Sequence, residues 1–218
     1  MFKLSTLVFG IFLIVTSAAA VAEGTERLPA QPPDGLALAT FAGGCFWCME
    51  AAYEKVDGVT RVISGYTGGH VPHPTYHQVS AGGTGHAESV RVIFDPDKVS
   101  YAHLLYVFWR NIDPVAKDRQ FCDVGHQYRT AIFYHDERQH RLAEESLQKL
   151  ADSGRFQKPI TTEIEAAGPF YKAEAYHQNY YRTHTARYQY YRLACGRDKR
   201  LHEIWGDQAT PQKEGHSE

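Results

Sequence analysis

Two adjacent glycines, Gly43 and Gly44, interrupt the chain between a short apolar run and a segment with helical spacing. The run Leu36–Phe41 (LALATF) predicts a buried strand. Beyond the glycines, apolar side chains recur three or four positions apart, at Phe46, Met49, Tyr53 and Val56, which predicts a helix. Because glycine permits a sharp turn, the chain is expected to pass from strand to helix here, with Cys45 at the N-terminus of the helix.

The rest of the chain alternates between strand and helix patterns. Further strands are predicted at 59–66, 88–94, 128–134 and 160–166, and helices at 100–109 and 137–150. A long loop rich in Gly, His and Pro covers residues 68–85, and a Tyr-rich segment follows the last strand. The order β-α-β-β-α-β-α-β predicts an α+β fold, a two-layer sandwich with a mixed β-sheet and a split β-α-β, ferredoxin-like core.

Residues 1–22 have the pattern of a secretory signal peptide. Lys3 precedes an apolar run over 4–15, and small residues end in Ala20-Val21-Ala22. An uncleaved anchor is the alternative, but the run is short for a membrane span of about 20 residues. We therefore expect an exported, periplasmic protein without stable membrane association after cleavage.

The remaining sequence predicts one domain between two polar segments. Residues 23–35 are rich in Pro and polar side chains and predict a linker, residues 36–206 form the domain, and residues 207–218 are a polar tail. A chain of 218 residues with 43% hydrophobic residues can bury one substantial core. The net charge of −2 argues against a general nucleic-acid-binding role. We expect a monomer.

Cys45 and Cys48 enclose two aromatic residues at the start of the first helix. Free N–H groups and the helix dipole stabilise an anion there, so we expect a lowered pKa and a nucleophilic thiol for Cys45. Alternatively, both cysteines are small buried hydrophobes, half of a zinc site, or the redox pair of a thiol-disulfide oxidoreductase. Trp47 stands between the cysteines, whereas in thioredoxin-like motifs it precedes the first.

The segment Gly43–Glu50 (GGCFWCME) resembles the signature of the A-type peptide methionine sulfoxide reductases. Other motifs of that family follow in the same order, at Ser64–Gly69, Pro74–Tyr76, Thr84–Glu88, Asn111–Pro114, Asp123–Arg129 and Phe170–Tyr180. The resemblance extends from about Ala39 to Trp205. It implies an enzyme that reduces methionine S-sulfoxide, free or in peptides and proteins, to methionine.

The resemblance also assigns roles to individual residues. Cys45 becomes the nucleophile that attacks the sulfoxide sulfur, and Glu88 the acid that protonates the sulfoxide oxygen. An acid at neutral pH requires a raised pKa, and therefore a partly apolar surrounding for Glu88. Tyr76 and Tyr128 are implied as hydroxyl donors to the same oxygen.

Three further residues are implied in substrate binding. Phe46 and Trp47 surround the methyl group of the substrate, and Asp123 makes a polar contact with the substrate backbone or a site water. Without the resemblance, these side chains are equally compatible with packing or turn roles. No metal and no bound cofactor is expected.

After the attack Cys45 is a sulfenic acid, which a second thiol resolves to a disulfide. The resemblance implies that an external dithiol of the thioredoxin type then reopens this disulfide. Many family members have glycine where this chain has Cys48, so the resemblance does not decide which cysteine resolves the sulfenic acid. We favour Cys195 slightly over Cys48, with Cys122 as a third candidate. A dithiol exchanger using Cys45 and Cys48, or a zinc-stabilised binding domain, is the alternative function.

Overall fold

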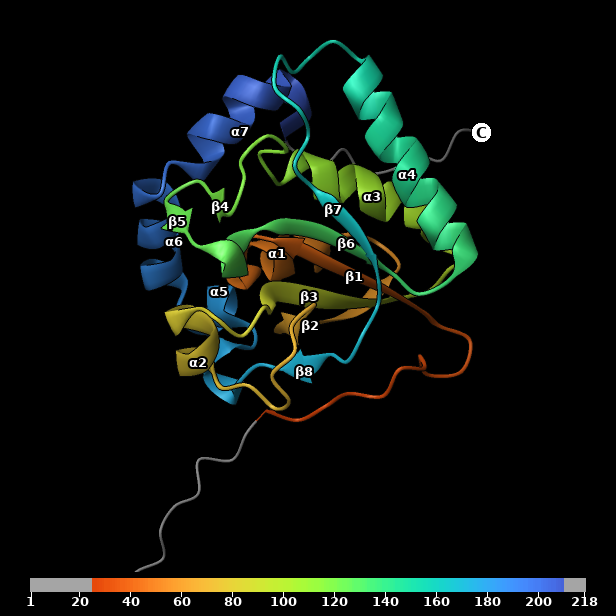
Figure 1. The fold of residues 1–218 in the computed structure, drawn as a ribbon, viewed down its shortest axis with the longest axis vertical. Coiled ribbons are helices and arrows are strands. Elements are labelled where there is room, and N and C mark those ends of the chain that lie inside the picture. Colours follow the sequence, from red (N-terminus) through yellow and green to blue (C-terminus); the bar gives the residue numbers. More distant parts are fainter. Residues whose placement is uncertain (1–24, 210–218) are drawn as a thin grey trace, which may run out of the picture.

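A mixed sheet of six strands forms the centre of the computed structural model, which describes residues 25–209 (Figure 1). The strands follow the order β7-β6-β1-β3-β2-β8. Their bounds are β1 Ala37–Gly43, β2 Val59–Thr67, β3 Ala87–Phe94, β6 Thr130–Tyr134, β7 Glu163–Ala166 and β8 Tyr171–Lys172. Neighbouring strands are antiparallel except β6 and β7, which are parallel. The predicted α+β class and mixed sheet are confirmed, and the ferredoxin-like core stays a prediction.

Helices cover the sheet and continue into the C-terminal segment (Figure 1). Their bounds are α1 Phe46–Tyr53, α2 Tyr76–Ala81, α3 Tyr101–Arg110, α4 Glu137–Asp152, α5 Tyr180–Thr183, α6 Thr185–Ala194 and α7 Arg197–Trp205. Short 3-10 turns are η1 His126–Tyr128, η2 Ala175–His177 and η3 Gly206–Ala209, and a small hairpin pairs β4 Arg119–Gln120 with β5 Asp123–Val124. Within residues 25–209, every helix is too short or too polar to cross a membrane.

Three helices, α2, α3 and α4, begin at a residue whose side chain caps the first turn. Ser100 accepts a hydrogen bond from the His103 amide at the start of α3, and Asp136 accepts one from the Gln139 amide at the start of α4. Thr75 and Gln78 form a reciprocal capping box at the start of α2. The helix α2 lies inside the segment 68–85, which is predicted as a loop. Its capping box favours a helix more strongly than the Gly and Pro content of the segment favours a loop.

Two other boundaries differ from the prediction. Tyr128 does not begin a strand but ends the 3-10 turn η1, because Gly125, at φ 141°, turns the chain before it reaches β6. The last predicted strand, 160–166, starts later than expected, because β7 begins at Glu163. The Tyr-rich segment, which received no assignment, forms α5 and α6. These helices lie beside the start of α1 on one side of the molecule (Figure 1).

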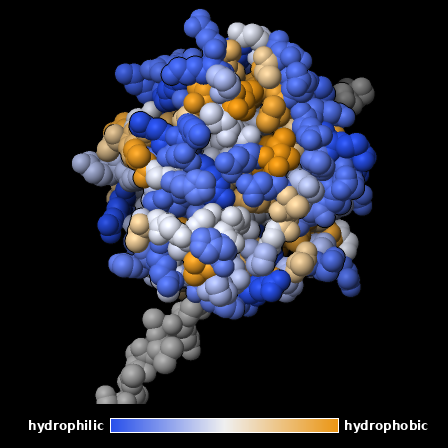
Figure 2. Space-filling view, in the orientation of Figure 1, coloured by the Kyte–Doolittle hydropathy of each residue, from blue (hydrophilic) through white to orange (hydrophobic). Residues whose placement is uncertain are grey.

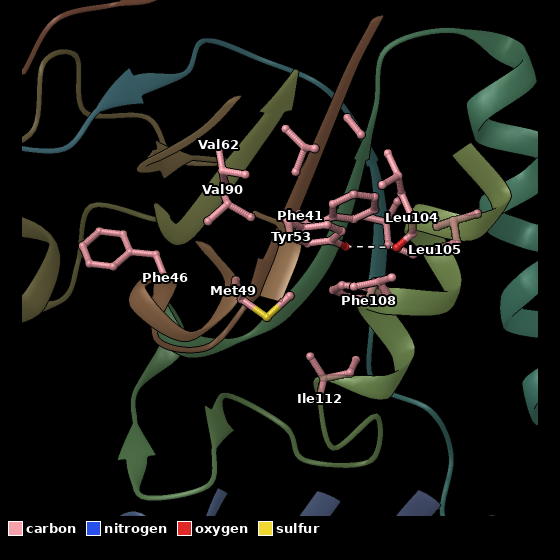
Figure 3. Close-up of a cluster of buried hydrophobic side chains, with 14 of the residues drawn as sticks. Phe41, Phe46, Met49, Tyr53, Val62, Val90, Leu104, Leu105, Phe108 and Ile112 are labelled. Atoms are coloured by element: carbon pink, nitrogen blue, oxygen red, sulfur yellow. Dashed lines mark hydrogen bonds between the residues drawn. The ribbon is translucent and has the colours of Figure 1, made fainter. Parts of the chain in front are cut away.

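The main core lies between the sheet and the helices α1 and α3. Phe41 of β1 stacks on Tyr53 of α1 and on Phe108 of α3, with ring centroids 5.1 and 5.3 Å apart. The Tyr53 hydroxyl donates to the Leu104 carbonyl at 3.1 Å, the bond drawn in Figure 3. Because this buried hydroxyl is satisfied, the core fixes α1 against α3, and with it the start of α1.

The turn between β1 and α1 is as tight as the two glycines predict. Gly44 has φ 78°, and a Cβ atom there would lie 2.5 Å from Cβ of the buried Gln120. Arg197 of α7 reaches this turn from the C-terminal side: its Nη2 donates to the carbonyls of Gly43, at 3.2 Å, and Asn111, at 2.6 Å. The C-terminal helix therefore closes the turn that presents Cys45.

The predicted signal peptide lies outside the described residues, and the described part of the predicted linker packs on the domain. The Thr25 hydroxyl donates to the Pro74 carbonyl, Leu28 N–H donates to the Phe170 carbonyl, and Arg91 donates to the Pro29 carbonyl. Residues 25–29 thus follow the β8 edge of the sheet. The face shown in Figure 2 is mostly hydrophilic, with small separate hydrophobic groups.

We expect Arg197→Met to destabilise the protein by about 3 kcal/mol, because it leaves two buried carbonyls without their donor. Arg197 is only 1% exposed, so water cannot replace the guanidinium without opening the fold. Urea denaturation measures the loss. Arg200→Met, at a more exposed ion pair with Asp113, is the control and should cost less than about 1 kcal/mol. Equal effects of the two substitutions would contradict this role of Arg197.

Candidate active site

Glu88 lies at the centre of the site, on β3 and directly against the first turn of α1. Its side chain is 3% exposed, and its Oε2 accepts a hydrogen bond from the Phe46 N–H at 3.2 Å. Phe46 immediately follows Cys45, so the strand that carries the carboxyl and the helix start that carries the thiol are held together. A glutamate that opens a strand is otherwise compatible with a plain surface carboxylate, and the burial of Glu88 excludes that role.

Burial raises the pKa of Glu88 to about 8, and the charges of Asp123 and Cys48 act in the same direction. The hydrogen bond from the Phe46 amide opposes this shift but is weaker than desolvation. Glu88 therefore carries a proton at neutral pH and can deliver it to an acceptor in the site. This is the raised pKa that the sequence analysis required of an acid at this position.

Tyr76 and Tyr128 come from separate elements and both lie near the Glu88 carboxyl. Tyr76 begins α2 and Tyr128 ends η1, and the pKa of each hydroxyl is raised by burial and by the nearby Glu88 and Cys45. For Tyr76 the pKa reaches about 12. Both hydroxyls therefore stay protonated and available as hydrogen-bond donors beside Glu88 and Cys45.

Cys45 and Cys48 are free, buried thiols that lie close enough for each to shift the pKa of the other. Burial raises the pKa of Cys45, so the expected lowering at the helix N-terminus is wrong for this residue in the closed, substrate-free site. The pKa of Cys48 is lowered to about 6, first by the hydrogen bond from Cys45 and further by Arg197 and Arg192. The pair can thus lose one proton near neutral pH, first from Cys48, and a proton passed from Cys45 to Cys48 then makes Cys45 the thiolate.

An aromatic wall surrounds the two cysteines. The Trp47 ring stacks on Tyr180 of α5, with centroids 3.8 Å apart, and its Nε1 donates to Nδ1 of His177 at 3.1 Å. The His177 ring packs against Phe46 and Tyr76 at 5.0 and 4.4 Å. The predicted apolar residues Phe46 and Trp47 therefore do flank the site, and C-terminal residues fix their orientation.

Asp123 and the other two cysteines lie at the edge of the site, beside Tyr191. Cys122 and Cys195 form a disulfide with Cα atoms 5.0 Å apart. Asp123, next in sequence to Cys122, accepts a hydrogen bond from the Tyr191 hydroxyl of α6. Two of the three resolving candidates are thus bonded to each other, and Cys48 is the candidate that is free and beside Cys45.

Sequence reasoning gave no role to Glu174, which shapes the site. Its carboxylate accepts hydrogen bonds from the Tyr66 hydroxyl, at 2.9 Å, and from the Tyr76 amide, at 2.7 Å. It thereby ties the start of α2, and with it Tyr76, to the sheet. Glu174 lies in the last family motif, so its position was marked, but its partners are about 100 residues away in sequence and no local pattern names them.

We expect the stability advantage of Glu88→Gln over the parent to grow with pH. Since the pKa of Glu88 is raised from 4.5 to about 8 in the folded protein, its stabilising effect is complete below about pH 4.5 and is lost as pH rises to 8. The slope approaches about 1.4 kcal/mol per pH unit. Glu88→Gln carries an uncharged amide at this position, so its stability does not fall with pH for this reason.

Urea denaturation of both proteins at several pH values between 5 and 8 measures this difference. The exposed Glu145→Gln is the control for loss of a carboxylate on the surface. A stability difference between Glu88→Gln and the parent that stays constant over this range would show that the Glu88 pKa is not raised by folding.

The family model for peptide methionine sulfoxide reductase matches residues 37–209 of this chain. Curated relatives include the peptide methionine sulfoxide reductases MsrA of Bacillus licheniformis and Bacillus subtilis. The first is 53% identical over 169 residues, which cover 78% of this chain and 93% of the relative. The second is 51% identical over 169 residues, covering 78% and 96%.

Solved structures agree with this assignment. Mxr1 of Saccharomyces cerevisiae in reduced form has a TM-score of 0.66 and 30% identity, covering 70% of this chain and 88% of that one. Methionine sulfoxide reductase A of Corynebacterium diphtheriae has a TM-score of 0.63 and 30% identity, covering 75% and 87%. With its buried acid, its thiol pair and these relatives, the chain belongs to the peptide methionine sulfoxide reductase family, as its sequence motifs implied.

Proposed function

We propose that this protein reduces methionine S-sulfoxide, free or within peptides and proteins, to methionine. The observation that carries the proposal is the protonated Glu88 carboxyl held against the start of α1, beside the free thiol of Cys45. A sulfoxide is a weak electrophile until its oxygen is protonated or strongly hydrogen-bonded. The site therefore unites the acid that activates the sulfoxide with the nucleophile that attacks it.

In the first step the sulfoxide oxygen lies among Glu88, Tyr76 and Tyr128, and the methyl group lies against Phe46 and Trp47. The Cys45 thiolate attacks the sulfoxide sulfur while Glu88 gives its proton to the oxygen. The oxygen ends on Cys45, which becomes a sulfenic acid, and methionine leaves as the reduced product. The two tyrosine hydroxyls stabilise the charge that develops on the oxygen.

In the second step Cys48 resolves the sulfenic acid. Its thiol attacks the Cys45 sulfur, a disulfide forms and water leaves. Two observations support this residue over Cys195: the free Cys48 thiol lies with Cys45 in one buried cluster, whereas Cys195 is already bonded to Cys122. This reverses the slight preference for Cys195 drawn from the sequence, which could not place the two cysteines relative to each other.

The reductant we propose is an external dithiol protein of the thioredoxin type, which reopens the Cys45–Cys48 disulfide by exchange. We further propose that the protein is exported and works in the periplasm. The signal-like residues 1–22 support export. The Cys122–Cys195 disulfide supports it too, because such bonds persist in oxidising compartments.

With dithiothreitol as reductant, we expect loss of only the S epimer of a methionine sulfoxide peptide. We expect Glu88→Gln to slow this reaction at least about a hundredfold, the usual loss for an acid catalyst. Chiral chromatography of the product measures the rate, and Glu145→Gln serves as the control. An enzyme that only exchanges dithiols through Cys45 and Cys48 would not depend on Glu88, so equal rates would refute the proposed acid.

We expect Cys48→Ser to leave Cys45 as a sulfenic acid after one turnover without reductant, because no neighbouring thiol can resolve it. Dimedone labelling of Cys45, read by mass spectrometry, detects this state. The parent and Cys195→Ser should show little labelling. Labelling in Cys195→Ser and none in Cys48→Ser would instead identify Cys195 as the resolving residue.

A further inference from the structure

The Cys122–Cys195 disulfide joins two segments that lie 73 residues apart in sequence and meet only at the edge of the site. Cys122 stands between β4 and β5 and is exposed, and Cys195 ends α6 and is half-buried. The catalytic steps above use Cys45 and Cys48 and leave this disulfide without a chemical role.

Each cysteine of the disulfide lies close in sequence to one partner of the hydrogen bond between Tyr191 and Asp123. Asp123 directly follows Cys122, and its Oδ2 accepts from the Tyr191 hydroxyl at 2.5 Å. Tyr191 is one helical turn before Cys195, whose N–H donates to the Tyr191 carbonyl at 2.9 Å. The disulfide therefore cross-links the two backbones that carry Asp123 and Tyr191, at the point where those side chains meet.

Tyr191 also reaches the nucleophile. Its ring packs edge-on against Trp47, with centroids 5.8 Å apart, and its hydroxyl is near enough to Cys45 to lower the pKa of that thiol, against the larger raising effect of burial. The hydroxyl has one proton. It can give this proton to Asp123 while it accepts from the Cys45 thiol, or turn it toward the thiolate once Cys45 ionises. Tyr191 thus contacts Cys45 in both protonation states.

The end of α6 is held by the disulfide, by the Arg192–Asp198 ion pair and by the buried Arg197 just beyond it, and α6 itself buries little apolar surface. Tyr188 is the one buried residue of the helix, and the flanking Tyr190 and Leu193 are 74% and 80% exposed. A helix that buries so little apolar surface gains little stability from packing. A covalent link at its last turn compensates by restricting the positions that Tyr191 can adopt.

We propose that the Cys122–Cys195 disulfide is a structural clamp outside the catalytic thiol set, and that it holds Tyr191 as a positioning residue between Asp123 and Cys45. The hydroxyl keeps the Cys45 sulfur on the side of the site where Glu88, Tyr76 and Tyr128 meet. This inference rests on the proposed function for its kinetic meaning, but the contacts that carry it do not depend on the substrate.

Single-turnover rates of S-epimer reduction test the clamp, because they report the attack of Cys45 and not its recycling. We expect Tyr191→Phe to lower this rate about tenfold with KM within twofold, since the ring against Trp47 stays and one hydrogen bond to a charged group is lost. The double variant Cys122→Ser/Cys195→Ser should lose about as much. Adding Tyr191→Phe to the double serine variant should lower the single-turnover rate less than a further twofold, because both changes remove the same contact.

Three results would overturn the proposal. A single-turnover rate unchanged in the double serine variant, with only steady-state turnover lost, would make the disulfide part of the recycling path. Effects of the two changes that multiply would show that the disulfide does not act through Tyr191. Tyr190→Phe, on the same helix, is the matched control, and an equal loss there would indicate a general effect of α6.

A second readout separates this inference from the proposed reaction. Alkylation of Cys45 by iodoacetamide, followed by mass spectrometry, needs no sulfoxide reduction. Tyr191→Phe should change the alkylation rate about tenfold when the disulfide is present and less than twofold in the double serine variant. If the parent reduces neither epimer, the proposed function fails, and this comparison alone decides the clamp: equal effects in both backgrounds would refute it.

Discussion

The hydrogen bond from the Phe46 amide to Glu88 is the contact on which the site depends. It joins the first turn of α1 to the central strand β3, with the nucleophile one residue before the donor. A helix amide lowers the pKa of a carboxyl, while burial raises it, and here burial is stronger. The same contact therefore fixes the geometry of acid and thiol and leaves the acid protonated.

This arrangement requires the chain to return to the site from its C-terminal third. Glu174 fixes Tyr76, His177 orients Trp47, and Tyr180 covers the Trp47 ring. Arg197 satisfies the carbonyl of the glycine turn. The helix start alone exposes unpaired groups, so the C-terminal segment is what buries it. The long-range contacts explain why one domain includes nearly the whole described chain.

The sequence predicted much of this because its strongest signals are local. Apolar patterns located the central strands and α3 and α4, and the family motifs named Cys45, Glu88 and both tyrosines. The failures have one physical origin: they depend on neighbours far along the chain. The pKa of Cys45 is set by burial and by its partners, and the pairing of Cys122 with Cys195 by how α6 folds back. Neither could be derived from spacing.

The two cysteine pairs differ in exposure, and this difference suits their roles. Cys45 and Cys48 are 6% and 1% exposed and lie together in one buried cluster. A sulfenic acid formed on Cys45 therefore meets Cys48 before it meets a dissolved oxidant, which limits irreversible oxidation. Cys122, in contrast, is exposed and would be open to oxidation as a free thiol. The disulfide between Cys122 and Cys195 prevents this oxidation and places a covalent link beside the reactive pair.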